Sequence, residues 1–314
     1  MPGGGYSIFT DADGYQASLL DMLDLLTLRP REFRARLIWV DLPSLRLLRA
    51  QEDAPRVAYV TLPTEDVFVT FATRRDLPLI VGGTELKFGD VMFHSRGDRL
   101  HQRTIAAGHW ASIALSPTSL MAFGRTIAGQ DVAAPPVSQI LRPRPADRQQ
   151  LLRLHMQAGR IAETDLNRIS HREIARALEQ DLILTLITCL TTGEVRADGA
   201  ARRRQVNALV RFEEALAAHP YRPQRMADVC RAISVSERVL RVSCARLLGM
   251  SPGRYQHLRR LKRVRTELKR ANPATVSSTE MMKRYGFAGL HRFLAEYWNA
   301  YGEMPPVPPR DAAH

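Results

Sequence analysis

The chain has few cysteines, no long apolar run and no leader-like segment, and each absence excludes a class of protein. Its 314 residues contain three cysteines, Cys189, Cys230 and Cys244, far apart and without CxxC or zinc-ligand spacing. Each lies in an apolar helical stretch, so we expect buried, reduced thiols. This usage argues against a secreted disulfide scaffold and against a structural metal site, and it favours an intracellular protein.

The chain also lacks a membrane signal. Its longest apolar run, Leu182 to Leu190, includes two threonines and is much too short to span a bilayer. The first residues, MPGGGYSIFTDADGYQ, have no basic segment followed by an apolar one, so no signal peptide is expected. We therefore expect a cytoplasmic protein with no membrane partner.

Positive charge is missing from the first two-thirds of the chain and concentrated in the last third. Residues 1–201 hold 23 Lys and Arg against 23 Asp and Glu, whereas residues 202–314 hold 22 against 9, a surplus of +13 that equals the net charge of the whole chain. A neutral part joined to a strongly basic part indicates a polyanion partner for the second part alone. A merely solvated basic face is the alternative.

Residues from about 34 to 120 read as short apolar runs separated by turn residues. The runs, at 36–40, 57–62, 67–71, 79–81 and 113–115, have the spacing of antiparallel strands, with turns at Gly82-Gly83, Phe88-Gly-Asp and Arg96-Gly-Asp. The pattern predicts a small antiparallel barrel or sandwich. The proline-rich segment from Asp131 to Pro145 is typical of a linker, and a helical pattern follows from Asp147 to Thr192.

Beyond residue 201 the helical pattern contains a helix-turn-helix unit. One helix is predicted from about Arg203 to His219, a second from Gln224 to Ala232, and a third from Ser236 to Leu248 after the turn Ile233-Ser-Val-Ser. Ser236 is the expected N-cap of the third helix, which has the size of a helix that enters the major groove. We expect Val239, Leu240, Cys244, Leu247 and Leu248 to be buried.

The other face of the Ser236–Leu248 helix carries candidate DNA contacts. Arg238 and Arg241 suit base edges or phosphate, since an arginine can bond guanine at two positions. Arg246 suits phosphate or solvent. Glu237 could accept from a cytosine, although simple stabilisation of the helix N-terminus is favoured.

A long basic helix is predicted from Pro252 to Arg270, with cations on several faces. Some of them, Arg259 and Arg263 among the candidates, would lie along the phosphate backbone. A second unit follows: Ser277-Ser-Thr-Glu280 has the pattern of a capping box, Gly286-Phe287 forms the turn, and the last helix runs from Ala288 to Ala300. His291 and Arg292 lie at the start of that helix, where base edges would be.

The helix from Glu173 to Leu190 carries an apolar stripe that must be covered. It can pack on the sheet domain or on a second copy of itself. Because it directly precedes the predicted DNA-binding region, we favour a homodimer through this helix.

The segments GMSPGRYQHLRRLKRVRTEL and RYGFAGLHRFLAEYWNAYGEMPP resemble the signature segments of the AraC/XylS family of bacterial transcription regulators. The resemblance covers about the last third of the chain. It implies a DNA-binding module of seven helices with two recognition helices in successive major grooves of double-stranded DNA. It also implies an N-terminal cupin-like barrel that binds a small effector, and activation through contact with RNA polymerase.

Two departures from the family pattern affect these expectations. Ser234 stands in the first turn where the family usually has glycine, so the backbone there is expected to be strained or differently shaped. Ala295 stands where relatives often have a polar or basic residue, and Leu290 and Leu294 are apolar at potentially groove-facing positions. We therefore expect Arg238 and Arg241 to discriminate bases, and His291 and Arg292 mainly to anchor the backbone.

The N-terminal histidines do not indicate a metal site. Residues from Lys87 to Gln102 resemble the Gly-Asp turn and strand of cupin-like sensors, but His94, His101 and His109 contain no His-x-His pattern. We expect no metal and no cofactor. Trp39 and Trp110 could line an apolar effector pocket, although core packing is favoured for each.

The sequence thus predicts an α+β multidomain chain: a β-rich, cupin-like sensor domain at 1–145, a helical linker or dimerisation segment at 146–195, and an all-α double helix-turn-helix domain at 201–306. The predicted function is sequence-specific transcription regulation, as a nucleoid-associated activator. A metal-dependent cupin enzyme with a DNA-binding tail is one alternative, but no P-loop, nucleophile elbow or ligand triad supports an enzyme. An architectural protein that binds DNA by charge alone is the other.

Overall fold

The computed structural model describes residues 2–19, 22–28, 32–165, 169–196, 200–270 and 278–305. The chain forms two compact units, Met1–Leu25 with Phe33–Gly199, and Leu26–Glu32 with Ala200–His314. The first is rich in antiparallel strands and the second is helical, so the predicted α+β architecture is confirmed. No helix within the described ranges is long and apolar enough to cross a bilayer.

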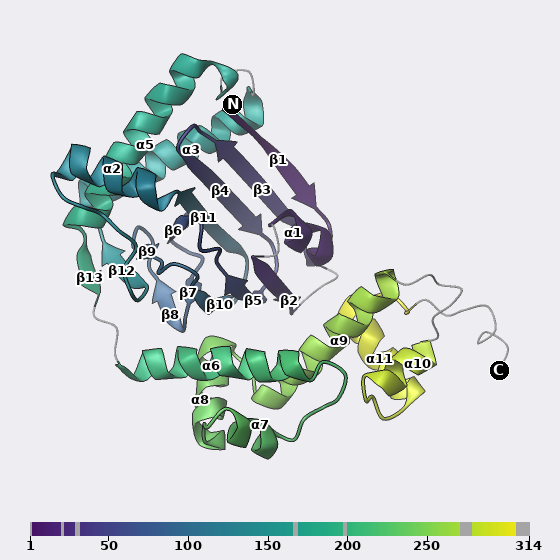
Figure 1. Ribbon diagram of the computed structural model, residues 1–314. Helices are drawn as coiled ribbons and strands as arrows, with labels where there is room; N and C mark the ends of the chain where they lie inside the picture. Colours follow the sequence, from purple (N-terminus) through teal and green to yellow (C-terminus); the bar gives the residue numbers. More distant parts are fainter. Residues whose placement is uncertain are drawn as a thin grey trace. The chain divides into compact units, whose positions relative to one another are not determined.

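The first unit is built on an eight-stranded sheet in which all neighbouring strands run antiparallel (Figure 1). In spatial order the strands are β1 (Gly3–Phe9), β3 (Ala35–Asp41), β4 (Leu45–Glu52), β11 (Gly108–Leu115), β6 (Val67–Ala72), β9 (Val91–Phe93), β12 (Gln139–Arg142) and β13 (Glu194–Arg196). β12 lies within the proline-rich segment that was predicted to be a linker. That prediction is wrong, because Ile140 and Leu141 pair with β9 and are buried.

A five-stranded sheet forms a second layer. Its order is β2 (Leu23–Thr27), β5 (Arg56–Thr61), β10 (Arg99–Thr104), β7 (Leu79–Val81) and β8 (Thr84–Leu86). Gly82 and Gly83, both at positive φ, join β7 to β8 in the two-residue turn that the sequence predicts. One hydrophobic cluster fills the space between the sheets and includes Leu100 of the smaller sheet and Phe68 of the larger. The short helix α1 (Ala12–Ser18) adds Tyr15 to it.

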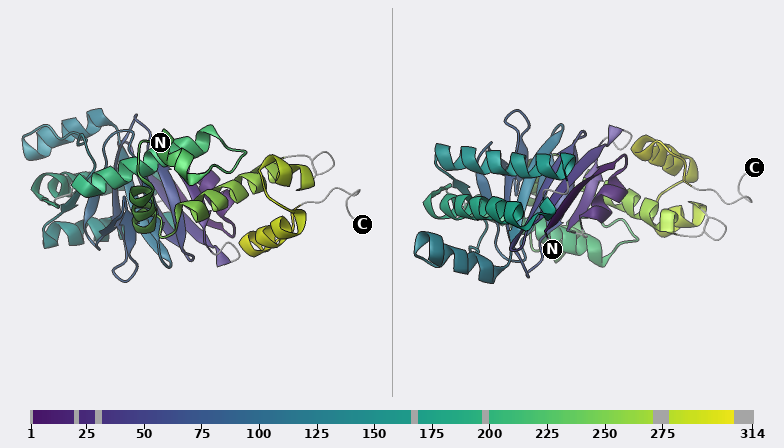
Figure 2. Two further views of the ribbon diagram at one scale, coloured as in Figure 1. Left: turned by 90° about the horizontal axis from the view of Figure 1, so that it is seen from below. Right: turned by 90° about the horizontal axis from the view of Figure 1, so that it is seen from above.

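Helices cover the other face of the large sheet. α2 (Pro117–Ala128), α3 (Pro145–Thr164) and α5 (Arg172–Thr192) lie side by side across the strands (Figure 2). Leu182 and Leu186 of α5 are fully buried in the same cluster as Ile38 and Ile113 of the sheet. The apolar stripe that suggested a homodimer is therefore covered by its own unit, and the reason for a dimer through Glu173 to Leu190 is removed. The three-part division of the chain stays a prediction.

The three cysteines are free and buried, as expected from the sequence. Burial raises the pKa of Cys189 and of Cys244 to about 12, so both thiols stay protonated at neutral pH.

The second unit contains six helices in its described residues. They are α6 (Ala200–Ala218), α7 (Met226–Ala232), α8 (Glu237–Leu247), α9 (Pro252–Arg270), α10 (Ser278–Arg284) and α11 (Leu290–Tyr301). α7 with α8, and α10 with α11, form the two predicted helix-turn-helix units. Leu261, Val264 and Leu268 of α9 share a core with Phe293 and Tyr297 of α11. Ser277, the predicted start of the capping box, lies outside the described residues.

Candidate functional site

The helix α8 is held at its start and along one face. Ser236 is its N-cap and accepts a hydrogen bond from the Val239 backbone N–H at 3.3 Å, as predicted. Leu240, Cys244 and Leu247 are buried, and so is Ser243. The spacing of these four residues is i, i+3, i+4 and i+7, which defines a single helix face.

Two valines of α8 lie outside that face. Val239 has 43% of its surface exposed and Val242 has 48%. The prediction that Val239 is buried is wrong: the i, i+3, i+4, i+7 register that begins at Leu240 leaves positions 239 and 242 on other faces. This spacing is visible in the sequence and is the signal that would have placed Val239 on an exposed face. Apolar side chains on an exposed helix face can contact the methyl group of thymine.

The predicted cations of α8 are exposed beside these valines. Arg238 and Arg241 both face solvent, and an Arg241 guanidinium nitrogen lies 4.0 Å from a carboxylate oxygen of Glu237. Arg246 is also exposed and donates to Gln205 at 3.3 Å. The structure therefore gathers Glu237, Arg238 and Arg241 on the first turns of one helix, where major-groove contacts from such a motif arise.

Of the two candidate arginines of α9, one is buried and the other is half-buried. Arg259 is only 8% exposed and forms an ion pair with buried Glu213 at 3.2 Å. Arg263 is half-buried and donates to the Leu216 carbonyl oxygen of α6 at 3.0 Å. Arg259 is corrected from a phosphate contact to an internal ion pair. Arg263 satisfies a carbonyl group near the end of α6, and its contact with phosphate stays a prediction. The prediction for Arg259 was wrong because a cation on a basic helix can also face a buried carboxylate instead of phosphate.

The second recognition helix, α11, offers fewer exposed arginines than α8. His291 and Arg292 are exposed near its start. Arg292 is held by Glu296 one turn later, with Nε donating to the carboxylate at 2.9 Å. Glu296 also lies 3.4 Å from the ring of His257 on α9. Leu290 and Trp298 are the large apolar residues exposed on this helix, with 40% and 45% of their surfaces accessible.

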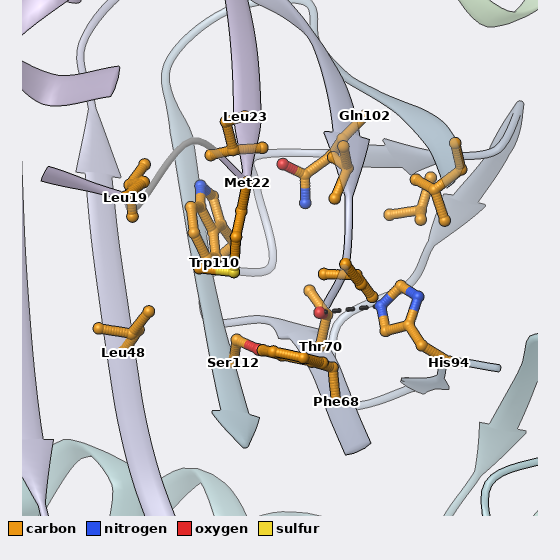
Figure 3. Close-up of a pocket in the computed structure, with 14 residues that line it drawn as sticks. Leu19, Met22, Leu23, Leu48, Phe68, Thr70, His94, Gln102, Trp110 and Ser112 are labelled. Atoms are coloured by element: carbon orange, nitrogen blue, oxygen red, sulfur yellow. Dashed lines mark hydrogen bonds between the residues drawn. The ribbon is translucent and has the colours of Figure 1, made fainter. Parts of the chain in front are cut away.

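Two cavities lie in the first unit, one within the two-sheet core and one beside it. The inner cavity has a volume of about 50 Å³ and is lined by Trp110, Phe68 and Gln102 among others (Figure 3). The outer cavity has a volume of about 420 Å³, and Trp39 is part of its wall. Five side chains border both cavities: Leu19, Met22, Leu48, Phe68 and Ser112.

Polar side chains of the inner cavity belong to hydrogen-bonded chains. His94 bonds Thr70 at 3.0 Å through Nε2 and Asp98 at 3.2 Å through Nδ1. Burial raises the pKa of Asp98, but hydrogen bonds from His94 and Ser138 outweigh this and lower it. Asp98 is therefore ionised at neutral pH, and it accepts a hydrogen bond from the Nδ1–H of His94.

The three N-terminal histidines do not come together. His94 is bound as described above, His101 lies against Tyr59 with ring centres 5.0 Å apart, and burial lowers the pKa of His109. Across the described residues, no group of three or more His, Cys, Asp or Glu side chains could hold a metal ion.

A family model described as a helix-turn-helix domain matches residues 229–307. A curated relative from Rhodococcus erythropolis, a probable thc operon regulatory protein, is 31% identical over 218 residues, which are 66% of this chain. The match spans 65% of the relative's own length.

Solved structures of two regulators are also similar. The AraC-like transcriptional activator CuxR is 14% identical, with a TM-score of 0.45 over 84% of this chain and 96% of that one. A probable AraC family regulator from Rhodopseudomonas palustris is 27% identical, with a TM-score of 0.29 over 32% of this chain and 92% of that one.

Proposed function

We propose that this chain, a member of the AraC/XylS family through its C-terminal helix-turn-helix domain, binds a specific DNA sequence and regulates transcription in response to a small molecule. The observation that carries the proposal is the exposed face of α8. Its first turns combine two arginines, a glutamate and two valines on a helix whose opposite face is fully anchored. This combination supplies both hydrogen-bonding and methyl-contacting groups for base edges.

These exposed residues also indicate which part of the DNA each one contacts. Arg238 and Arg241 are proposed to contact bases, with Glu237 beside them and Ser236 holding the helix start. Arg246, His291 and Arg292 are proposed to contact phosphate, because each is exposed on or beside a recognition helix.

The experiment begins with selection of bound duplexes from a random pool by the full-length protein at physiological salt. A regulator enriches one sequence, whereas a protein bound by charge alone enriches none. Footprints of the double variant Arg238→Ala/Arg241→Ala on the enriched site then test whether the exposed face of α8 recognises bases. Arg231→Ala, an exposed arginine of α7 paired with Asp228 at 3.1 Å, is the matched control.

The proposal is supported if the double variant loses discrimination and the control keeps it. It fails if the pool shows no enrichment, or if both variants lower affinity equally for every duplex.

Activation through RNA polymerase is a further part of the proposal, and it rests on the family resemblance. A reporter fused to the selected site checks it: activation predicts more transcript when the protein is present, and a fall would identify a repressor.

The small molecule is proposed to bind in the first unit. The outer cavity of about 420 Å³ is within the range of sites that bind small ligands, and its walls are largely apolar. Removal of a bound ligand is expected to change affinity for the selected duplex.

A further inference from the structure

The inner cavity has a wall chemistry that restricts what can enter it. Its lining contains ten apolar side chains and four polar ones, Thr70, His94, Gln102 and Ser112, all of which are less than 9% exposed. No Asp, Glu, Lys or Arg belongs to the lining that the structure describes. A charged group placed here would lose its hydration without meeting an opposite charge, so an uncharged group is favoured.

Gln102 is the polar residue whose orientation is fixed. Its Oε1 accepts a hydrogen bond from Arg56 Nη2 at 2.5 Å, and its backbone carbonyl accepts from Arg56 Nη1 at 3.1 Å. Because a guanidinium can only donate, the amide oxygen of Gln102 must face Arg56. The amide nitrogen must then face the other way. Figure 3 shows it pointing into the space between Trp110 and His94.

The arginine that orients Gln102 is itself fixed. Arg56 and Glu52 are completely buried and form an ion pair at 2.9 Å. Glu52 also accepts hydrogen bonds from the Tyr15 hydroxyl at 2.9 Å and the Trp110 indole N–H at 3.0 Å. This buried network therefore positions two walls of the cavity, the Trp110 ring and the Gln102 amide. Such a network is costly to desolvate, and it is stable here because each of these contacts satisfies a buried polar group.

We propose that the inner cavity receives the uncharged, acceptor-bearing end of a small apolar ligand, and that the Gln102 amide donates a hydrogen bond to a carbonyl or ether oxygen of that ligand. This inference rests on the proposed function, since it names the class of molecule that the regulator senses. The inner cavity alone, at about 50 Å³, holds only a few heavy atoms. The remainder of the ligand lies in the outer cavity, where Met22 and Phe68 border both spaces.

Two probes of the same shape test the acceptor. Acetophenone carries a carbonyl oxygen, and α-methylstyrene has a methylene group in its place. Calorimetric titration of the full-length protein is expected to give at least tenfold tighter binding of acetophenone, with benzoate as a charged probe that binds more weakly than the ketone. Equal affinity for acetophenone and α-methylstyrene, or binding of neither, overturns the inference.

Variants of Gln102 test whether this residue causes the preference for acetophenone over α-methylstyrene. Gln102→Leu removes the donor at similar size and is expected to reduce the preference to within threefold. Gln102→Glu keeps an acceptor for Arg56 and replaces the donor that faces the cavity, so it tests the same point should the leucine variant fail to fold. Gln130→Leu, on an exposed residue after α2, is the matched control and should keep the full preference.

Retention of the tenfold preference in a folded Gln102 variant overturns the role of this residue. Selection of DNA by the wild-type protein is measured separately. A protein that selects a sequence but does not prefer acetophenone contradicts only this inference, whereas a protein that selects no sequence contradicts the proposed function.

Discussion

Each of the two helix-turn-helix units is stabilised by a glutamate that accepts a hydrogen bond from a tyrosine hydroxyl and pairs with an arginine. We call this set of three side chains a brace, and the two braces are buried to different depths. Beside the first, Glu213 of α6 accepts a hydrogen bond from the hydroxyl of Tyr255 on α9 and pairs with Arg259 of the same helix, and all three residues are less than 9% exposed. In the second, Glu267 of α9 accepts from the Tyr285 hydroxyl at 2.6 Å and from Arg284. There the glutamate side chain is 29% exposed and the arginine 49%.

The depth of the brace parallels the chemistry of each recognition helix. The unit with the buried brace exposes two arginines and two valines on α8, whereas on α11 Arg292 is held by Glu296. A recognition helix that discriminates bases must be positioned closely, and one that contacts the backbone tolerates more freedom. The comparison therefore supports a division into a unit that reads bases and a unit that anchors phosphate.

The largest expected effect comes from removing the buried brace. Glu213→Ala leaves the Arg259 guanidinium buried without its carboxylate, which typically costs about 3–5 kcal/mol of folding free energy. Glu267→Ala removes a partly exposed pair and is expected to cost within about 1 kcal/mol. Calorimetric unfolding of the full chain measures both. Equal losses would show that depth does not distinguish the two braces.

The second effect concerns the turn of the second unit. Gly286 has φ of 67°, and a Cβ placed there would lie 2.6 Å from Cδ of Pro223. Gly286→Ala should therefore cost more than the roughly 1–2 kcal/mol of a left-handed alanine. Gly129, at the same φ with nothing within 4 Å of the added Cβ, is the matched control. Calorimetry should show a larger loss for Gly286→Ala; similar losses would mean that Pro223 moves aside.

The sequence predicted the helices and strands better than it predicted which of them pack or pair with one another. Apolar periodicity and turn residues located the strands at 36–40 and 67–71 and the helices of both helix-turn-helix units, because local spacing determines these features. β12 was missed because Ile140 and Leu141 form a short apolar pair among prolines. Its pairing with β9, more than forty residues away, leaves no local pattern.

The candidate site could be predicted only where exposure follows from spacing. Arg238 and Arg241 lie on the face opposite the buried residues of α8, and the sequence shows this. Arg259 could not be placed, because its partner Glu213 is on a different helix. Gln102 carries no local signal at all: its role depends on Arg56, forty-six residues away, which fixes its amide.

The third prediction separates base reading from anchoring on the selected duplex. Arg241→Ala is expected to relax preference at one base pair, with a loss of about 1–3 kcal/mol against the preferred base. Arg292→Ala should weaken all sequences about equally and lower the salt dependence by about one counterion. Competition titrations at several salt concentrations measure both effects. The division fails if Arg292→Ala relaxes base preference while Arg241→Ala leaves it intact.

The smallest effect concerns the turn of the first unit. Among the described residues, Ser234 is the only non-glycine at positive φ, with φ of 55°, which bears out the backbone strain expected from a serine in this turn. A left-handed non-glycine residue costs roughly 1–2 kcal/mol, and the extra freedom of glycine in the unfolded chain offsets about half of that gain. Ser234→Gly should therefore stabilise the unit by up to about 1 kcal/mol.

Because the side chain of Ser234 is exposed, its removal sacrifices no buried contact. Ser236→Gly serves as the contrast, since it removes the N-cap hydroxyl that accepts from Val239 and should lower stability by a few tenths of a kcal/mol. Thermal unfolding followed by circular dichroism should show opposite shifts for the two variants. A fall in Tm for Ser234→Gly would mean that the serine stabilises this turn by more than the strain costs. The turn at Ser234 would then stabilise the first helix-turn-helix unit in addition to the buried brace.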